Sequence, residues 1–282
     1  MGTNVTRKYC LWAVMLLIGT TMIAQEVRSF DGYKNNPVHP DWGAAHFPIV
    51  YDVPLAYADS ISTPSGPERP NARNISNQLF AQDQLFNDIR SLSAFTWAWG
   101  QFIDHDITKS PNNNNEFLPI QVPAGDRFFD PAGTGTVMIP MHRSDSDPAT
   151  GSDPLNPRKH TNEITAFIDG SAVYGSSESR ANYLRSFADG KLRVSEGNMP
   201  PFNTVDGEFS SDIDPNAPEM DMPIPFVDKY YVCGDSRANE NPCLLAIHTL
   251  FVREHNRLCD ELKIDHPDWD DETLFQHARR LV

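Results

Sequence analysis

Apolar side chains recur with the period of an amphipathic helix in three segments of this chain. From Ser91 to Ile107 they return about every 3.6 residues, which predicts a helix with one core-facing stripe. That stripe consists of Leu92, Phe95, Trp99, Phe102 and Ile103. We expect Ser91 or Ser93 to cap this helix, because a serine oxygen accepts a hydrogen bond from a free N–H of the first turn.

A second helix is predicted after Asn241 and Pro242, since a capping residue followed by proline marks a helix start. Its expected core face is Leu244, Leu245, Ile247, Leu250, Phe251 and Leu258. His248 and His255 are seven residues apart on one face of it. We interpret His255 as a structural histidine with satisfied hydrogen bonds.

The last predicted helix begins at Asp270, which caps an acidic first turn, and runs to Val282. Elsewhere loop-forming residues prevail. The 23 prolines among 282 residues are more than the average proline content of about 5% would give. The segment from Phe30 to Asn77 is expected to be an irregular arm, and the four asparagines at 112–115 a loop. The predicted fold is therefore mainly α, with long loops and few short strands.

The N-terminus has the pattern of a secretory signal. Arg7 and Lys8 precede an apolar run from Cys10 to Ile23, which is short for a membrane span. We expect residues 1–24 to form a signal peptide cleaved after Ala24, and an uncleaved membrane anchor is the alternative. The protein is therefore predicted to be secreted or extracellular, or membrane-anchored as part of a larger polypeptide.

The mature chain would be acidic and would keep three cysteines. The formal net charge of −15 argues against nucleic acid as a partner, because phosphate binding needs basic surface. Asn74 begins an N-I-S glycosylation acceptor, in agreement with secretion. Among Cys233, Cys243 and Cys259 the simplest disulfide joins Cys233 to Cys243, but the sequence leaves the connectivity open.

The densest cluster of chemically active residues is WGQFIDHD, from Trp99 to Asp106. On a helix Gln101, Asp104 and His105 share one face, and Asp106 points elsewhere. An unpaired buried charge costs several kcal/mol, so such a cluster needs a partner, a metal or a ligand. The alternative interpretation is a solvated helix end or a satisfied core histidine.

A second motif, GDSRANEN from Gly234 to Asn241, places Arg237 and Glu240 directly before the second helix. Taken alone, these residues indicate an ordinary surface ion pair. Together the two motifs resemble those of animal-type haem peroxidases, the family of myeloperoxidase, lactoperoxidase and thyroid peroxidase. The resemblance covers nearly all of the chain after the leader, and within the family it looks most like the peroxidase domains of dual oxidases and their invertebrate relatives.

The resemblance implies a haem b cofactor held and assisted by two sets of side chains. The implied catalytic set is His105 as the distal histidine, Arg237 as the distal arginine and Gln101. The implied cofactor-binding set is Asp104 and Glu240, each through an ester link to the haem. A sulfonium link is not expected, because Asn241 stands where myeloperoxidase has methionine.

The implied reaction is reduction of hydrogen peroxide. His105, with an unperturbed pKa near 6.5, suits a group that takes a proton from peroxide and returns it to the departing oxygen. Arg237 would stabilise negative charge as the O–O bond stretches. The donor oxidised in return would be a halide or a phenol, and Gln101 would help to bind a small anion.

A third segment, EITAFIDGSAVYGSSESRANYLRSF from Glu163 to Phe187, resembles the family's calcium loop and the helix after it. The implied Ca²⁺ ligands are Thr165, Phe167 through its carbonyl, Asp169 and Ser171, with Asp106 arriving from the distal helix. Carboxylate, hydroxyl and carbonyl oxygens are the ligands that Ca²⁺ prefers. Composition alone indicates a strand that runs into a turn at Gly170.

The family ligates iron through a proximal histidine located beyond the position of Val282, and none of the nine histidines of this chain matches it. We therefore expect residues 25–282 to form the N-terminal, distal part of a C-terminally truncated, animal haem peroxidase-like domain. A catalytically inactive adhesion or interaction module and an incomplete fragment remain alternatives. The sequence does not predict an oligomeric state.

Overall fold

The computed structural model describes residues 27–66, 68–224 and 226–282. The predicted signal peptide, its cleavage after Ala24 and the alternative of an uncleaved anchor lie outside these residues. Within the described ranges no helix has the length and apolar character needed to cross a membrane. The fold is mainly α with few short strands, as predicted.

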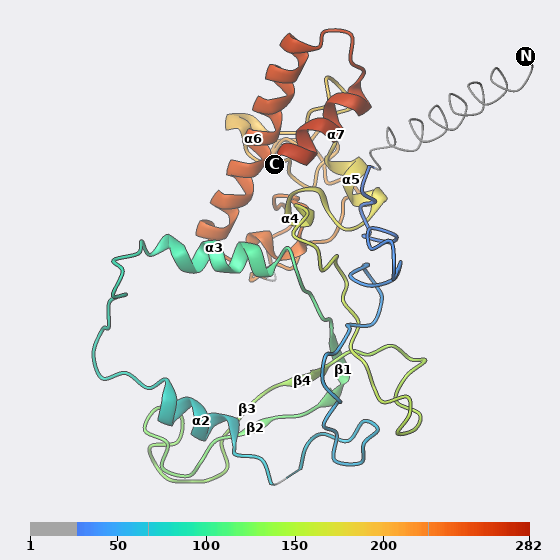
Figure 1. The fold of residues 1–282 in the computed structure, drawn as a ribbon. Coiled ribbons are helices and arrows are strands. Elements are labelled where there is room, and N and C mark those ends of the chain that lie inside the picture. Colours follow the sequence, from blue (N-terminus) through green and yellow to red (C-terminus); the bar gives the residue numbers. More distant parts are fainter. Residues whose placement is uncertain (1–26, 67, 225) are drawn as a thin grey trace, which may run out of the picture.

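Two long C-terminal helices organise the helical part. Helix α6 (Pro242–Asp265) begins where predicted, because Asn241 accepts a hydrogen bond from the Leu244 N–H at 2.9 Å. Helix α7 (Asp271–Leu281) begins after Asp270, whose carboxylate accepts from the Thr273 N–H at 2.8 Å. The chain turns between them and α7 packs back on α6 (Figure 1).

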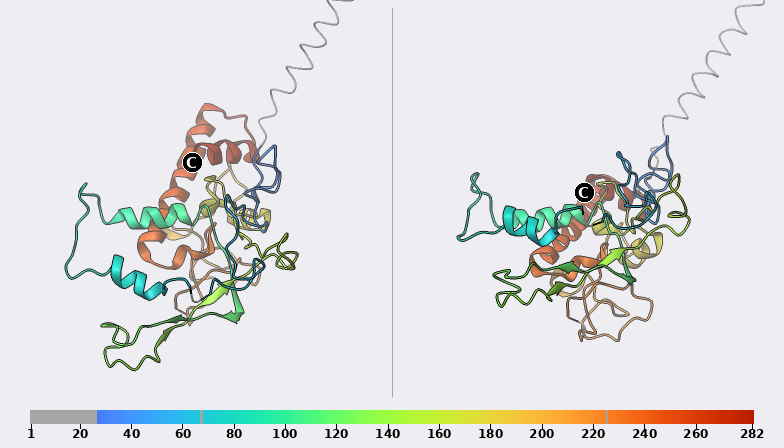
Figure 2. Two further views of the ribbon diagram at one scale, coloured as in Figure 1. Left: turned by 60° about the horizontal axis from the view of Figure 1, so that its bottom comes forward. Right: turned by 90° about the horizontal axis from the view of Figure 1, so that it is seen from below.

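Shorter elements surround α6. Helix α3 (Phe95–Asp104) packs beside it, and α4 (Ser171–Tyr174) and α5 (Glu178–Leu184) follow the predicted calcium loop (Figures 1 and 2). The 3₁₀ segments are η1 (Glu196–Asn198) and η2 (Ser236–Asn239). One core joins these elements, and its most deeply buried large side chains are Tyr174, Phe275, Leu244, Leu274, His248 and His255.

The strands form two small antiparallel sheets away from α6. Strand β1 (Asn112–Phe117) pairs with β4 (His142–Ser144), and β2 (Ile120–Gln121) pairs with β3 (Met138–Ile139). The prediction of a loop at the asparagine run is therefore wrong, because pairing with β4 overrides the low strand propensity of asparagine. Helix α2 (Ala72–Leu79), capped by Asn71, likewise replaces the end of the predicted irregular arm.

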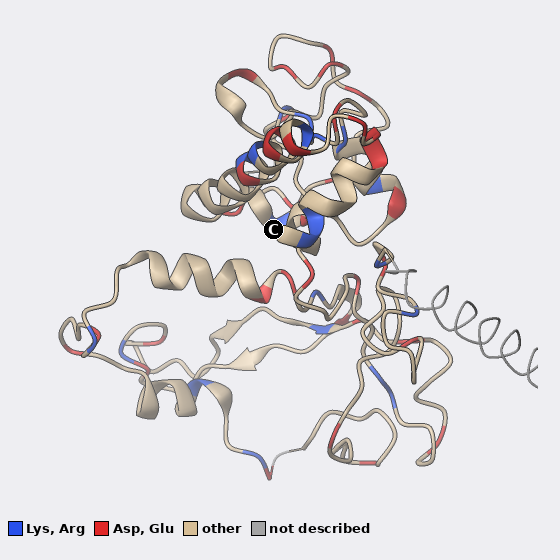
Figure 3. Ribbon diagram, turned by 45° about the horizontal axis from the view of Figure 1, so that its top comes forward, with Lys and Arg blue, Asp and Glu red and all other residues tan. Residues whose placement is uncertain are grey.

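Helix α3 is shorter and more exposed than predicted. Ser91 has a φ of +55°, and the helix begins only at Phe95, with the Ser93 hydroxyl accepting from the Phe95 N–H at 3.2 Å. Within the predicted stripe Phe102 is buried, whereas Leu92, Phe95 and Trp99 are 47%, 53% and 48% exposed. The stripe is buried only in part: Ala98 and Phe102 are covered, whereas Trp99 stacks on Phe251 of α6 with one face and stays half exposed. Figure 3 shows that α3 carries no charge before its last residue.

The core face of α6 is also rotated from the prediction. Leu244 and Ile247 are buried as expected, but Leu250 is 62% exposed. Val252, Thr249, His248, His255 and Cys259 take the buried positions instead. The structural interpretation of His255 is confirmed, because its ring nitrogens contact the Tyr174 hydroxyl and the Gly190 carbonyl, each at 2.9 Å.

The simplest disulfide does not form. Cys233, Cys243 and Cys259 are all free thiols in the structure. Cys233 is buried in the core before η2, and Cys243 is half-buried in the first turn of α6. Burial raises the pKa of the Cys233 thiol to about 12, so it stays protonated and unreactive.

Candidate active site

The C-terminal end of α3 places His105 in a buried position. His105 is the residue that follows the helix, and it is 4% exposed. Its Nδ1 is buried without a hydrogen-bond partner among the described residues and lies 3.7 Å from the carboxylate of Asp235. One ring nitrogen therefore faces an anion, at a distance longer than a normal hydrogen bond.

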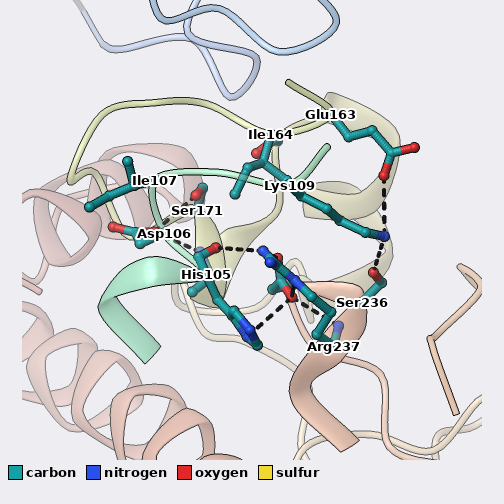
Figure 4. Close-up of polar contacts among 12 residues, drawn as sticks. His105, Asp106, Ile107, Lys109, Glu163, Ile164, Ser171, Ser236 and Arg237 are labelled. Atoms are coloured by element: carbon teal, nitrogen blue, oxygen red, sulfur yellow. Dashed lines mark hydrogen bonds and ion pairs between the residues drawn. The ribbon is translucent and has the colours of Figure 1, made fainter. Parts of the chain in front are cut away.

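Arg237 reaches the same place from η2. Its Nε and Nη2 donate to the two carboxylate oxygens of Asp235, each at 2.9 Å, and its backbone N–H donates to Asp235 Oδ1 at 2.9 Å. Its Nη2 also approaches the backbone carbonyl of His105 at 3.5 Å (Figure 4). The structure thus brings together two side chains that are 132 positions apart in the sequence. The alternative of an ion pair between Arg237 and Glu240 is wrong, because Asp235 is the recorded ionic partner of Arg237.

The structure adds Asp235, which sequence reasoning missed. Its side chain is 1% exposed and contacts both Arg237 and His105. Burial would raise the pKa of Asp235, but the hydrogen bonds and charge of Arg237 outweigh burial and lower it. The sequence signal that could have identified Asp235 is its position two residues before the arginine in GDSR. This spacing lets the carboxylate fold back onto the guanidinium.

The same surroundings keep His105 neutral. Burial lowers the pKa of His105, and the charge of Arg237 lowers it further, against smaller opposing effects of Asp235 and Asp104. A buried imidazole with a lowered pKa carries a lone pair at neutral pH, and it can therefore accept a proton. The interpretation of His105 as merely a solvated helix end is wrong, because the side chain is buried.

The other polar residues of the first motif are more open. Gln101 donates to Glu240 at 2.7 Å and accepts from the Asn241 amide at 2.9 Å. Asp104 and Glu240 are both exposed residues. The carboxyl group of Glu240 is still partly buried, and this burial raises its pKa. These residues flank His105 and Arg237 in the sequence, so the site has a buried acid–base centre with accessible carboxylates beside it.

Asp106 points away from this centre, as predicted, and enters the loop before α4. Its carboxylate accepts from the N–H groups of Asp169, Gly170 and Ala172 at 3.1, 3.1 and 2.8 Å, and from the Ser171 hydroxyl at 2.9 Å. The strand expected from composition is absent from residues 163–170, and Gly170, with a φ of +77°, starts α4 instead.

The loop holds a second buried carboxylate close to Asp106. Asp169 accepts from the Thr165 hydroxyl at 3.0 Å through one oxygen, while its other oxygen is buried without a partner. Burial and the neighbouring charge of Asp106 raise the pKa of Asp169 to about 6. The described residues contain no cluster of three His, Cys, Asp or Glu side chains, so a cation here would need hydroxyl and carbonyl oxygens as well.

Phe167, the remaining residue of the predicted calcium set, is half-buried. Its ring packs against Gly32 and Gly43, and a Cβ at position 43 would lie 2.9 Å from it. This packing fixes the loop to the N-terminal arm.

Lys109 connects the three segments that form the site. Its ammonium group contacts the Ser236 hydroxyl at 2.7 Å, Asp221 at 2.9 Å and Glu163 at 3.2 Å (Figure 4). It therefore ties the chain after α3 to the residue before Arg237 and to the start of the Asp169 loop. Together Asp221 and Glu163 outweigh the effect of burial and raise the pKa of Lys109.

Comparisons with known proteins identify relatives of this chain in sequence and in fold. A family model described as animal haem peroxidase matches residues 27–282. Dual oxidase 1 of Canis lupus familiaris is 36% identical over 290 residues, covering 97% of this chain and 18% of that protein. Peroxidase A from Dictyostelium discoideum superposes with a TM-score of 0.72 and 31% identity over 90% of this chain and 50% of that one. A fatty acid alpha-dioxygenase of Arabidopsis thaliana, with a TM-score of 0.64 and 20% identity over 89% of this chain and 34% of that one, shares the fold.

Proposed function

This chain belongs to the animal haem peroxidase family, and we propose that its residues 25–282 are the distal part of a haem peroxidase domain. The observation that carries the proposal is the meeting of His105 and Arg237 over one buried carboxylate. The chain spans less than a fifth of the length of its dual oxidase relatives, so a larger parent polypeptide is part of the proposal. The activity proposed is reduction of hydrogen peroxide coupled to oxidation of a halide or a phenol.

The residues present fit a haem b group. The buried imidazole of His105 lies beside Arg237 and Asp235, and the exposed carboxylates of Asp104 and Glu240 would hold the group at its edge. When bound, the haem supplies the iron at which peroxide is reduced and the oxidising capacity for the donor.

The side chains then divide the acid–base work. His105 accepts a proton from peroxide at Nε2 and returns it to the departing oxygen. Arg237 keeps its charge and stabilises negative charge that develops on the oxygens. Gln101, held between Glu240 and Asn241, positions a small anion such as a halide.

The loop before α4 fits Ca²⁺. One carboxylate oxygen of Asp169 has no hydrogen-bond partner among the described residues, and the buried Asp106 lies close to it. Burying both carboxylates in charged form costs free energy unless a cation neutralises them. Asp106, Asp169, Thr165 and Ser171, with the carbonyl of Phe167, would hold the ion through hard oxygen atoms.

Secretion completes the proposal. The signal sequence and the acceptor Asn74, which is exposed on α2, support passage through the secretory pathway.

The test is to express the complete protein with haem and to compare His105→Ala with His39→Ala, a variant of an exposed histidine outside the site. We expect a Soret band in all three proteins, and peroxide-dependent oxidation of iodide or guaiacol that falls by about 10²- to 10⁴-fold only in His105→Ala. Equal turnover in His105→Ala would contradict the assigned base. Absence of haem from the wild-type protein, with tolerance of Arg237→Ala, would indicate the interaction module instead.

A further inference from the structure

Asp235 is the carboxylate that contacts both members of the acid–base centre. Its Oδ1 receives the Arg237 Nε and backbone N–H at 2.9 Å and lies 3.7 Å from His105 Nδ1. Its Oδ2 receives Arg237 Nη2 at 2.9 Å. The guanidinium thus binds in the bidentate geometry that fixes its plane, and the side chain of Asp235 is 1% exposed.

The position of Asp235 is fixed from behind by backbone contacts. Its N–H donates to the Ala172 carbonyl at 3.0 Å, and the same carbonyl contacts His248 Nδ1 at 3.1 Å. Ala172 in turn donates its N–H to Asp106. The backbone of Asp235 is therefore held against α4, and its buried carboxylate lies between His105 and Arg237.

A fixed anion beside one ring nitrogen selects between the two tautomers of a neutral imidazole. The carboxylate favours a proton on Nδ1, since Nδ1–H directed at it is attractive whereas a lone pair directed at it is repulsive. In the structure Nδ1 is a buried ring nitrogen without a hydrogen bond among the described residues, and the Asp235 carboxylate lies 3.7 Å from it. A proton on Nδ1 leaves the lone pair on Nε2. In Ser-His-Asp triads a buried aspartate selects the histidine tautomer in this way, and replacing that aspartate by asparagine gives the wrong tautomer.

We propose that Asp235 is a positioning residue that holds His105 as the Nδ1–H tautomer and fixes the plane of the Arg237 guanidinium. The tautomer stands on the geometry of this chain alone. Its consequence for peroxide chemistry rests on the proposed function, because the lone pair on Nε2 matters there only when a protic ligand such as peroxide binds.

The experiment compares the complete wild-type protein with Asp235→Asn. In haem-free protein labelled with ¹⁵N-histidine, and assigned with His105→Ala, the imidazole nitrogen shifts report the tautomer. We expect Nδ1–H in the wild type and a shift of the proton toward Nε2 in Asp235→Asn. In haem-loaded protein we expect cyanide association, followed by the Soret shift, to slow by about tenfold or more, because hydrogen cyanide must also give its proton to a base.

Two further variants make the outcome specific. Asp221→Asn alters an acid on Ser236 and Lys109 that has no recorded hydrogen bond to His105 or Arg237, and we expect it to match the wild type in both measurements. Arg237→Gln leaves the Asp235 carboxylate in place and should keep the Nδ1–H tautomer even if Asp235→Asn does not fold.

The inference is overturned if Asp235→Asn keeps the wild-type tautomer and cyanide rate, if Asp221→Asn reproduces its effects, or if Arg237→Gln loses the tautomer. A complete protein that takes up no haem would refute the proposed function, and the nitrogen shifts would still decide the role of Asp235.

Discussion

Gly234 packs directly against the backbone of Val173. A Cβ at position 234 would lie 2.5 Å from the Val173 carbonyl carbon and 2.6 Å from backbone atoms of Ser171 and Gly175. This contact brings the residue after Gly234, the carboxylate Asp235, against α4 and under His105. A residue without a side chain is therefore what allows the arginine motif and the Asp106 loop to meet.

Gly234→Ala is expected to destabilise the protein by about 1–3 kcal/mol, because the new methyl group meets rigid backbone. Gly100→Ala is the control, since a Cβ at position 100 meets nothing within 4 Å and alanine favours the helix. Urea unfolding measures both changes. Equal stability of the two variants would show that α4 can yield to the added atom.

Calcium removal should lower the stability of the folded protein. Ligand at about 100 times its dissociation constant stabilises a fold by about 2.7 kcal/mol, so the melting temperature should rise with added CaCl₂ and fall with a chelator. Asp169→Asn should abolish this response, because it removes one of the two buried charges. Asp153→Asn, in an exposed turn, should keep it. A melting temperature of the wild type that is indifferent to calcium would contradict the proposed cation site.

Covalent attachment of haem is predicted from the accessibility of Asp104 and Glu240. Acid–acetone extraction should leave haem on the wild-type protein and release it from the double variant Asp104→Asn, Glu240→Gln, since amides do not form the esters. Asp268→Asn, an exposed acid on the turn before α7, should behave as the wild type. Mass spectrometry of the extracted protein measures the result, and full release from the wild type would mean that neither ester forms.

Stability should fall on acidification because of His255. Burial lowers the pKa of His255 to about 4, below its unfolded value of 6.5. The unfolded chain therefore binds more protons between these values, and stability present above pH 6.5 is lost as the pH falls toward 4, by up to about 1.4 kcal/mol per pH unit. Urea unfolding at pH 6.5 and 5 should show a smaller loss in His255→Gln than in the wild type. His39→Gln, at an exposed position, should keep the wild-type dependence.

Secretion predicts a glycan on Asn74. Protein from eukaryotic cells should lose mass on treatment with an N-glycosidase, and both Asn74→Gln and Ser76→Ala should remove that change. Ser76→Thr keeps the acceptor motif and should keep the glycan. An unmodified Asn74 in protein recovered from the medium would remove this support for the secretory route.

Local signals in the sequence determined the starts of α6 and α7. The side chains of Asn241 and Asp270 each accept a hydrogen bond from an N–H group three residues later. They also predicted that His105 and Asp106 point to different sides, since adjacent positions at one helix end diverge, and the structure confirms this separation. These features depend on neighbours along the chain, and so one sequence sufficed.

Only the tertiary structure decided which groups meet. Asp235 is an ordinary acid in the sequence, and it becomes the common partner of Arg237 and His105 through packing of its loop on α4. Contacts between distant segments likewise decided three further features. These are the strand at the asparagine run, the exposure of Trp99 and the free thiol of Cys233. Periodicity and propensity describe one element at a time, whereas burial and pairing are properties of two elements in contact.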